Sequence, residues 1–327
     1  MADFVVRFLL CNLLISGIIG ILLLFKRIFR NILSSRMQYH LWFLLLGLLV
    51  IPFLPFPFVS FVQLLAWTGI LPNAPISAAD TAVSQITGAN LPGNTNWIND
   101  FTLSVNKNTP FFSGYLLPGI WIAGIIFMIL LMAKSSFHLR ALKKSALPLQ
   151  NPDVRRLYKK CLDEIGIRKY IPVYSTAFLK SPVITGLLNP CIYLPLHLIS
   201  DYTETDTRYM LLHELQHYKH KDMAAAYLMN LTGVIYWFNP FIWYVLKEMR
   251  YDREIACDTS VLEMLEEDSY EDYGNTLINF AEKLSLTPFP FVSGLSGNMK
   301  QMKRRIINIA SYQKPTFRKK LKGTAAF

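Results

Sequence analysis

Residues 211–217 read Leu-Leu-His-Glu-Leu-Gln-His, which puts two histidines four positions apart with a glutamate directly after the first. If this stretch is helical, His213 and His217 lie on one face and can bind a single Zn²⁺ through their imidazoles. Glu214 lies beside them and can take a proton from a water on the metal. The chain has only six histidines, so chance would give this pattern in about one chain in a hundred of this composition.

The alternative for this stretch is a surface helix that carries two solvated histidines. Three leucines argue against it, because they would bury one side of the helix: Leu211, Leu212 and Leu215. We therefore predict a zinc site in which His213 and His217 are ligands and Glu214 is the general base.

A catalytic zinc needs a third protein ligand and one open position. The candidates after the motif are His220, Asp222, Glu248, Glu254 and Asp258. Glu254 comes from a separate helix that can pack across the first. Asp258 is one turn further on and could hold the second ring nitrogen of a ligand histidine. His220 is disfavoured, since no glycine breaks the helix before it. The alternative for the two acidic residues is an ordinary solvated face.

Long apolar segments dominate the rest of the sequence. Hydrophobic residues make up 52% of the chain and charged residues only 17%, which points to a membrane protein. We predict transmembrane helices in residues 8–25, 39–62 and 114–133. A signal peptide is the alternative for the first, but its basic cluster follows the apolar run instead of preceding it.

Positive charge sets the predicted orientation. The loop 26–38 holds four basic residues, whereas 63–113 holds only Lys107. The protein is therefore expected in the cell membrane, with its amino terminus on the extracellular side and the residues after 133 in the cytosol. The predicted parts are two transmembrane helices in 1–62 with a cytosolic loop at 26–38, an extracellular loop at 63–113, a transmembrane helix at 114–133, a cytosolic zinc metalloprotease domain at 134–320, and the start of a truncated transmembrane helix at 321–327.

The net charge of +11 is attributed to segments that flank apolar runs. Membrane lipid is thus the expected partner, and direct binding of nucleic acid is not expected. The four cysteines form no CxxC pair and are expected to stay reduced in the cytosol.

The region after residue 150 has the pattern of a small α+β domain. Residues 152–165 read as a helix that Gly166 ends. Short strands are expected at 173–175, 183–185 and 191–194 between proline and glycine breaks. Thr203 and Asp206 resemble a capping box that opens the motif helix. Further expected elements are an apolar stretch at 223–246 with a break at Asn239-Pro240, helices at 251–265 and 270–284, and a loop at 285–298.

The order of these features resembles a known family. The matching segments are 181–186, 190–195, 211–217, 237–240 and 254–258, together with the amino-terminal helices and the loop around Trp97 and Asp100. They look like the transducer part of the BlaR/MecR beta-lactam sensor-transducers, which are membrane metallopeptidases of the gluzincin type.

The resemblance implies that Glu254 is the third zinc ligand and Glu214 the general base. It also implies self-cleavage, a cytosolic protein substrate such as a transcriptional repressor, a homodimer, and induction of antibiotic resistance. The family's penicillin-binding sensor would follow a further transmembrane helix, so no residue here is assigned to drug binding. Substrate is expected to pair with an edge strand within 183–194. The cut is expected in the loop 285–298 or the basic stretch through Arg305.

Two other functions fit the same features. One is a housekeeping membrane protease that removes damaged proteins. The other is a non-catalytic membrane receptor whose metal is structural.

Overall fold

The computed structural model describes residues 2–29, 33–50, 111–179, 181–285 and 299–314. The predicted extracellular loop up to residue 110, the loop at 286–298 and the segment 321–327 lie outside these residues. Contacts divide the chain into one unit of residues 1–15 and 47–122 and a second of residues 16–46 and 123–327. In the first unit, the rings of Phe8 and Trp121 lie 5.1 Å apart.

Helices cover all of the first and third segments predicted to cross the membrane and residues 39–48 of the second, whose residues 51–62 lie outside the described part of the chain. These helices are α1 (Ala2–Ile28), α2 (Ser35–Leu48) and α6 (Phe111–Ser145). Among the described residues, one stretch is both long and apolar enough to span a bilayer, Leu116–Ser135, with a mean hydropathy of 2.5 and no part of it buried. The other two spans stay predictions.

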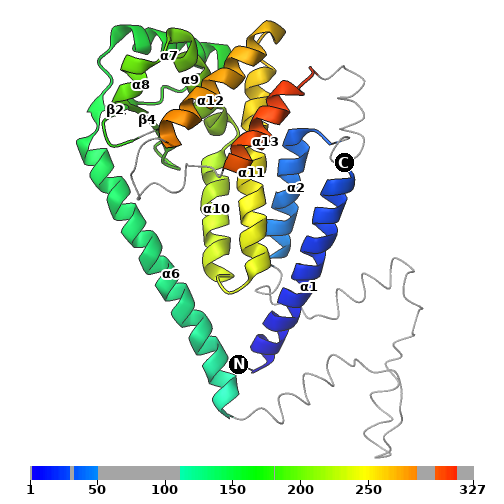
Figure 1. The fold of residues 1–327 in the computed structure, drawn as a ribbon. Coiled ribbons are helices and arrows are strands. Elements are labelled where there is room, and N and C mark those ends of the chain that lie inside the picture. The colour runs from blue at the N-terminus through cyan, green and yellow to red at the C-terminus, as the bar shows by residue number, and fades with distance from the viewer. Residues whose placement is uncertain (1, 30–32, 51–110, 180, 286–298, 315–327) are drawn as a thin grey trace, which may run out of the picture. The chain divides into compact units, whose positions relative to one another are not determined.

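The rest of the second unit is mostly helical with one small mixed sheet (Figure 1). Its helices are α7 (Pro152–Ile165), α8 (Leu196–Asp201), α9 (Glu204–Lys219), α10 (Asp222–Ile235), α11 (Pro240–Leu262), α12 (Tyr270–Ser285) and α13 (Met299–Ala310). A short 3₁₀ helix, η2 (Glu267–Ser269), precedes α12. The α+β class predicted from the sequence is thus confirmed.

Local signals explain where several of these helices begin and end. The Asn151 side chain caps α7, and Gly166 ends it in the left-handed conformation with φ of 80°. The capping box predicted for Thr203 and Asp206 is present at the start of α9. Asn239 caps α11, whose first residue is Pro240.

One helix differs from its prediction. The sequence analysis placed 223–246 and 251–265 in separate elements, but α11 runs without interruption from Pro240 to Leu262. The charged residues from Lys247 onward end the apolar run, yet they are good helix formers and leave the backbone intact. One continuous helix therefore connects the Asn239 break to Glu254.

The sheet has the strand order β1-β2-β4-β3, with β1 (Leu147–Pro148), β2 (Val173–Thr176), β3 (Val183–Thr185) and β4 (Cys191–Pro195). Strands β2 and β4 are parallel, and the other two pairs are antiparallel. Gly186 turns the chain between β3 and β4 with φ of 99°, where a Cβ would lie 2.3 Å from the Asn189 carbonyl oxygen. The edge-strand prediction for 183–194 is right for β3 and wrong for β4, which is paired on both sides.

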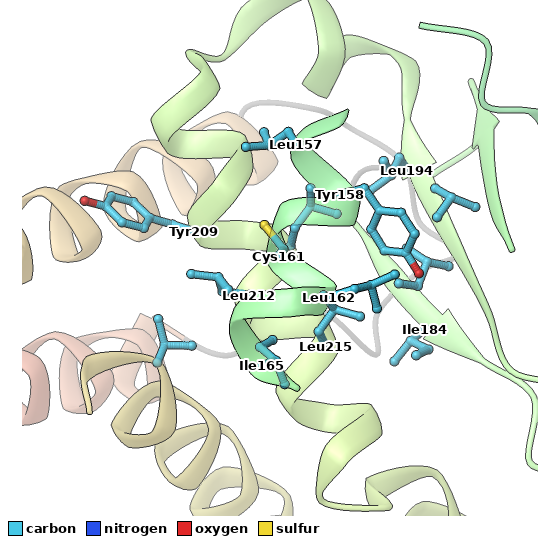
Figure 2. Packing of buried hydrophobic residues seen from close by; sticks show 14 of the residues in the cluster. Leu157, Tyr158, Cys161, Leu162, Ile165, Ile184, Leu194, Tyr209, Leu212 and Leu215 are labelled. Atoms are coloured by element: carbon cyan, nitrogen blue, oxygen red, sulfur yellow. The ribbon is translucent and has the colours of Figure 1, made fainter. Parts of the chain in front are cut away.

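A hydrophobic core joins the sheet to α7 and α9 (Figure 2). Leu157, Cys161 and Leu162 of α7 lie in this core, as do Leu212 and Leu215 of α9. Because these leucines face α7, the residues on the opposite side of α9 are turned toward α11. Packing thus decides which face of the motif helix can carry chemistry.

Candidate metal centre

The two motif histidines and the carboxylate of Glu254 converge in the structure. One carboxylate oxygen of Glu254, Oε2, lies 3.5 Å from His213 Nε2 and 3.8 Å from His217 Nε2. Ligands bound at about 2.0–2.1 Å in a tetrahedron lie about 3.3 Å apart. These donor atoms therefore fit a zinc ion with little movement.

The second ring nitrogen of His213 is held by a buried group of polar side chains. Its Nδ1 lies 3.2 Å from Asp258 Oδ1 and 3.2 Å from the Tyr273 hydroxyl. Tyr273 donates to Asp258 over 2.7 Å, and Arg305 donates to both Asp258 oxygens over 2.7 Å. These contacts fix the ring so that Nε2 faces Glu254.

Opposing effects set the charges in this group. Burial lowers the pKa of His213, but Asp258 and Glu254 outweigh it and raise the pKa to about 9. Burial raises the pKa of Glu254, but His217, His213 and the neighbouring arginines hold it well below its usual range. Asp258 likewise has a lowered pKa, because Arg305 outweighs its burial. Both acids are therefore carboxylates, as metal binding requires.

Glu214 lies with the two motif histidines in a group whose possible ligand atoms are within 4.8 Å of one another. Its Oε2 accepts a hydrogen bond from the backbone N–H of Ile184 in β3 over 3.3 Å. Burial raises the pKa of Glu214, and the two histidines only partly offset this. A raised pKa makes this carboxylate a stronger base than an ordinary glutamate, which suits a group that must take up a proton.

A turn directly after α9 brings the Asp222 carboxylate to His217. α9 ends at Lys219, and Lys221 adopts the left-handed conformation with φ of 57°. The expectation that His220 continues the helix is thus wrong, because the turn forms without a glycine. The turn places Asp222 Oδ2 2.7 Å from His217 Nδ1, where it fixes that ring as Asp258 fixes the other.

A second group of potential ligands surrounds the other ring nitrogen of His217. Cys257 Sγ lies 3.1 Å from His217 Nδ1 and 3.3 Å from Asp222 Oδ2. Burial raises the pKa of the Cys257 thiol well above its usual range, and the neighbouring carboxylates raise it further. Without a metal, the thiol therefore keeps its proton and donates it to Asp222 Oδ2.

Sequence comparison identifies the family. Residues 6–309 match the family described as BlaR1 peptidase M56. The chain belongs to this family. It is 29% identical over its full length to regulatory protein BlaR1 of Bacillus licheniformis, and it covers 54% of that protein.

More distant relatives cover the same part of the chain. The methicillin resistance mecR1 protein of Staphylococcus aureus is 23% identical over 315 residues, with 94% of this chain and 52% of the relative covered. Regulatory protein BlaR1 of Staphylococcus aureus is 24% identical over 313 residues, with 92% and 51% covered. This M56 chain thus spans about half the length of the curated relatives it matches.

The remaining candidate ligands lie away from the centre of the M56 site. Glu248 pairs with Arg304 at 3.6 Å, and the Nε2 atom of His220 lies 3.4 Å from the Ser260 hydroxyl. Asp222 contacts His217 through the nitrogen that points away from Glu254. Among the five candidates, only Glu254 meets both Nε2 atoms.

Sequence reasoning missed three supporting residues: Tyr39, whose hydroxyl donates to Asp222, and Tyr273 and Arg305, which donate to Asp258. Tyr273 and Arg305 follow Asp258 on two later helices, and Tyr39 precedes the motif by more than 170 positions. No periodic or spacing signal connects them to the histidines. Only an observed packing of α2, α12 and α13 could have identified them.

One predicted cleavage region is disfavoured. The basic stretch through Arg305 belongs to α13, a regular helix in which Arg305 is paired with Asp258. A protease that pairs an extended peptide with an edge strand would have to unfold this helix first. The cleavage prediction at 286–298 lies outside the described residues.

Proposed function

We propose that this chain is the zinc endopeptidase part of a membrane-bound regulator of beta-lactam resistance. The convergence of His213, His217 and Glu254 on one position carries this proposal. His213, His217 and Glu254 would hold the zinc, and Asp258 would orient His213. Membership of a peptidase family supports a hydrolytic role for the site.

Zinc, when bound, would polarise a peptide carbonyl and make a water molecule more acidic. Glu214 would accept the proton of that water and pass it to the departing amine. Its raised pKa favours the first transfer, because it makes the carboxylate a stronger base than an ordinary glutamate. The hydrogen bond from Ile184 would keep the carboxylate oriented during the cycle.

The substrate would be an extended segment of protein that adds to the free edge of β3. Within the part of the chain that the structure describes, this strand pairs only with β4, and its Ile184 N–H points at Glu214. A peptide on that edge would pass directly over the candidate zinc position. Backbone pairing would tolerate many sequences, so access would set the selectivity.

We further propose that an external beta-lactam signal controls this cytosolic site. The relatives are named regulatory protein BlaR1 and methicillin resistance mecR1 protein, which supports a regulatory role in resistance. The protein substrates would be this chain itself and a cytosolic repressor. The membrane helices would have an external amino terminus, and a homodimer is proposed by family analogy.

Cleavage mapping of the full-length protein in lipid nanodiscs tests this proposal. Glu214→Gln should bind zinc but lose about 10²–10⁴-fold in cleavage rate, since general-base catalysis contributes that much. Glu271→Gln, an exposed glutamate on α12, should cleave like the wild type.

Each contrary outcome has a distinct meaning. Equal cleavage by Glu214→Gln and wild type excludes Glu214 as the base. A wild-type protein without zinc excludes the metalloprotease. A protein that binds zinc but cleaves neither itself nor an added substrate supports a receptor with a structural metal.

A further inference from the structure

Three residues on one face of α2 contact the helices that carry the candidate metal centre. Arg36, Tyr39 and Trp42 recur every third position and therefore share a face. Arg36 donates to the Ser260 hydroxyl over 2.8 Å, and Trp42 Nε1 donates to Asp252 over 2.6 Å. Both acceptors belong to α11, so α2 is attached to the helix that bears Glu254.

Tyr39 makes the contact closest to the centre. Its hydroxyl donates to Asp222 Oδ1 over 3.2 Å, while Asp222 Oδ2 lies 2.7 Å from His217 Nδ1. Tyr39 and Asp222 are both buried, with 4% and 3% of their surface exposed. The two oxygens of one buried carboxylate thus connect α2 to a candidate zinc ligand.

This contact fixes the orientation of the Asp222 carboxylate. With Oδ1 held by Tyr39 and Oδ2 by His217 and Cys257, the group has a partner on each oxygen. Removing the tyrosine hydroxyl would leave a buried oxygen unsatisfied, which favours rotation of the carboxylate. His217 would then lose the hydrogen bond that selects its tautomer.

The surroundings of Tyr39 leave room for movement. A cavity of about 310 Å³ is lined by Arg36, Tyr39, His40, Phe43, His220 and Ala256. A shift of α2 could therefore withdraw the Tyr39 hydroxyl without displacing the core around α7 and α9. Position 39 also begins the second predicted transmembrane segment, so such a shift would start at the membrane boundary.

We propose that Tyr39 is a positioning residue that couples α2 to the zinc site through Asp222 and His217. This inference rests on the proposed function, because it requires His217 to be a metal ligand. A movement of α2 would change zinc affinity and ligand geometry without any contact between α2 and substrate. The membrane segment would thereby regulate the peptidase.

The test compares Tyr39→Phe with Tyr158→Phe in the full chain, purified in detergent micelles. Tyr158 is an equally buried tyrosine whose hydroxyl donates to the Ile171 carbonyl oxygen over 2.8 Å, far from the metal centre. Zinc affinity is measured by competition with a chelator. Partners that orient ligands contribute roughly 10–100-fold, so Tyr39→Phe, one step further out, should lower the affinity about three- to tenfold. Tyr158→Phe should leave it unchanged.

A double-mutant cycle tests whether Tyr39 acts on His217 through Asp222. In an Asp222→Asn background, Tyr39→Phe should have little further effect, because the two residues act through one hydrogen-bonded path. The spectrum of the cobalt-substituted protein should change in Tyr39→Phe and not in Tyr158→Phe. A general loss of stability would affect both variants alike.

Three results would overturn the inference. They are a wild-type zinc affinity in Tyr39→Phe, an equal loss in Tyr158→Phe, and an undiminished effect of Tyr39→Phe when Asp222 is already asparagine. If the wild-type chain binds zinc and cleaves its substrate in these cases, the proposed function survives. If it binds no zinc, both proposals fall together.

Discussion

The two candidate zinc-binding histidines are supported in different ways. His213 is held by Asp258, Tyr273 and Arg305, which come from α11, α12 and α13. His217 is held by Asp222, which in turn accepts hydrogen bonds from Tyr39 of α2 and from the Cys257 thiol. The first support is a buried ion pair, and the second relies on neutral donors.

This difference indicates which of the two histidines can lose its support at the smaller cost in free energy. Arg305 and Asp258 compensate each other's buried charges, so separating them is costly. A tyrosine hydroxyl carries no charge and can withdraw at a much smaller cost. The His213 side therefore acts as a fixed support, whereas the His217 side can respond to α2.

The largest effect is expected from breaking the fixed support. Arg305→Ala would leave the Asp258 carboxylate, which is 0% exposed, without its main charge partner. The free energy of unfolding should fall by about 3–5 kcal/mol, as for other buried pairs that lose one member. Denaturant titration of the purified chain measures this change.

The neighbouring residue provides the control. Arg304 pairs with Glu248 at 3.6 Å and is 43% exposed at its side chain. Arg304→Ala should cost less than about 1 kcal/mol. Equal losses in the two variants would contradict the distinction between the two supports.

The next largest change in the free energy of unfolding is expected when His213 titrates in the metal-free chain. Its folded pKa of about 9 lies above the ordinary value of 6.5, so protonated His213 stabilises the fold below pH 6.5. That contribution, about 3 kcal/mol at 1.36 kcal/mol per pH unit, should disappear as the pH rises from 6.5 through 9.

Unfolding experiments on chelator-treated protein across this pH range measure the effect. A His213→Gln variant should lack this pH dependence. If the variant shows the same decline as the wild type, another group is responsible. Zinc should reverse the trend, because it competes with the proton for the ring.

Replacing the two orienting carboxylates should separate affinity from stability. Asp222→Asn and Asp258→Asn should each lower zinc affinity about 10–100-fold. Only Asp258→Asn should also destabilise the metal-free chain strongly, since it leaves Arg305 without its bidentate partner. Chelator competition and denaturant titration measure the two quantities. Equal stability losses in the two variants would show that both supports are alike.

The smallest changes in stability are expected at the turn between α9 and α10, which places Asp222 beside His217. Lys221 has φ of 57°, which a β-branched residue adopts poorly, so Lys221→Val should cost about 1–2 kcal/mol. Lys221→Gly should be stabilising or neutral within about 1 kcal/mol. Thermal unfolding of the two variants checks the order. A more stable valine variant would show that the turn is not strained.

Several elements could be predicted because their signals are local. The helix at 152–165 has a cap, a proline at its first position and a glycine stop, and α7 has these bounds. The strands near 173, 183 and 191 are bounded by turn residues, and all three are present. By contrast, β1 has two residues and α8 has six, too few to show any periodicity.

The sequence alone determined the motif helix, its cap and the placement of its two histidines on one face, because these depend on residues within a few positions of one another. Only the tertiary structure decided that Glu254 meets both Nε2 atoms and that Asp222, Tyr39, Tyr273 and Arg305 support them. Those contacts join helices far apart in the chain. They depend on how α2, α11, α12 and α13 pack together, which no local pattern encodes.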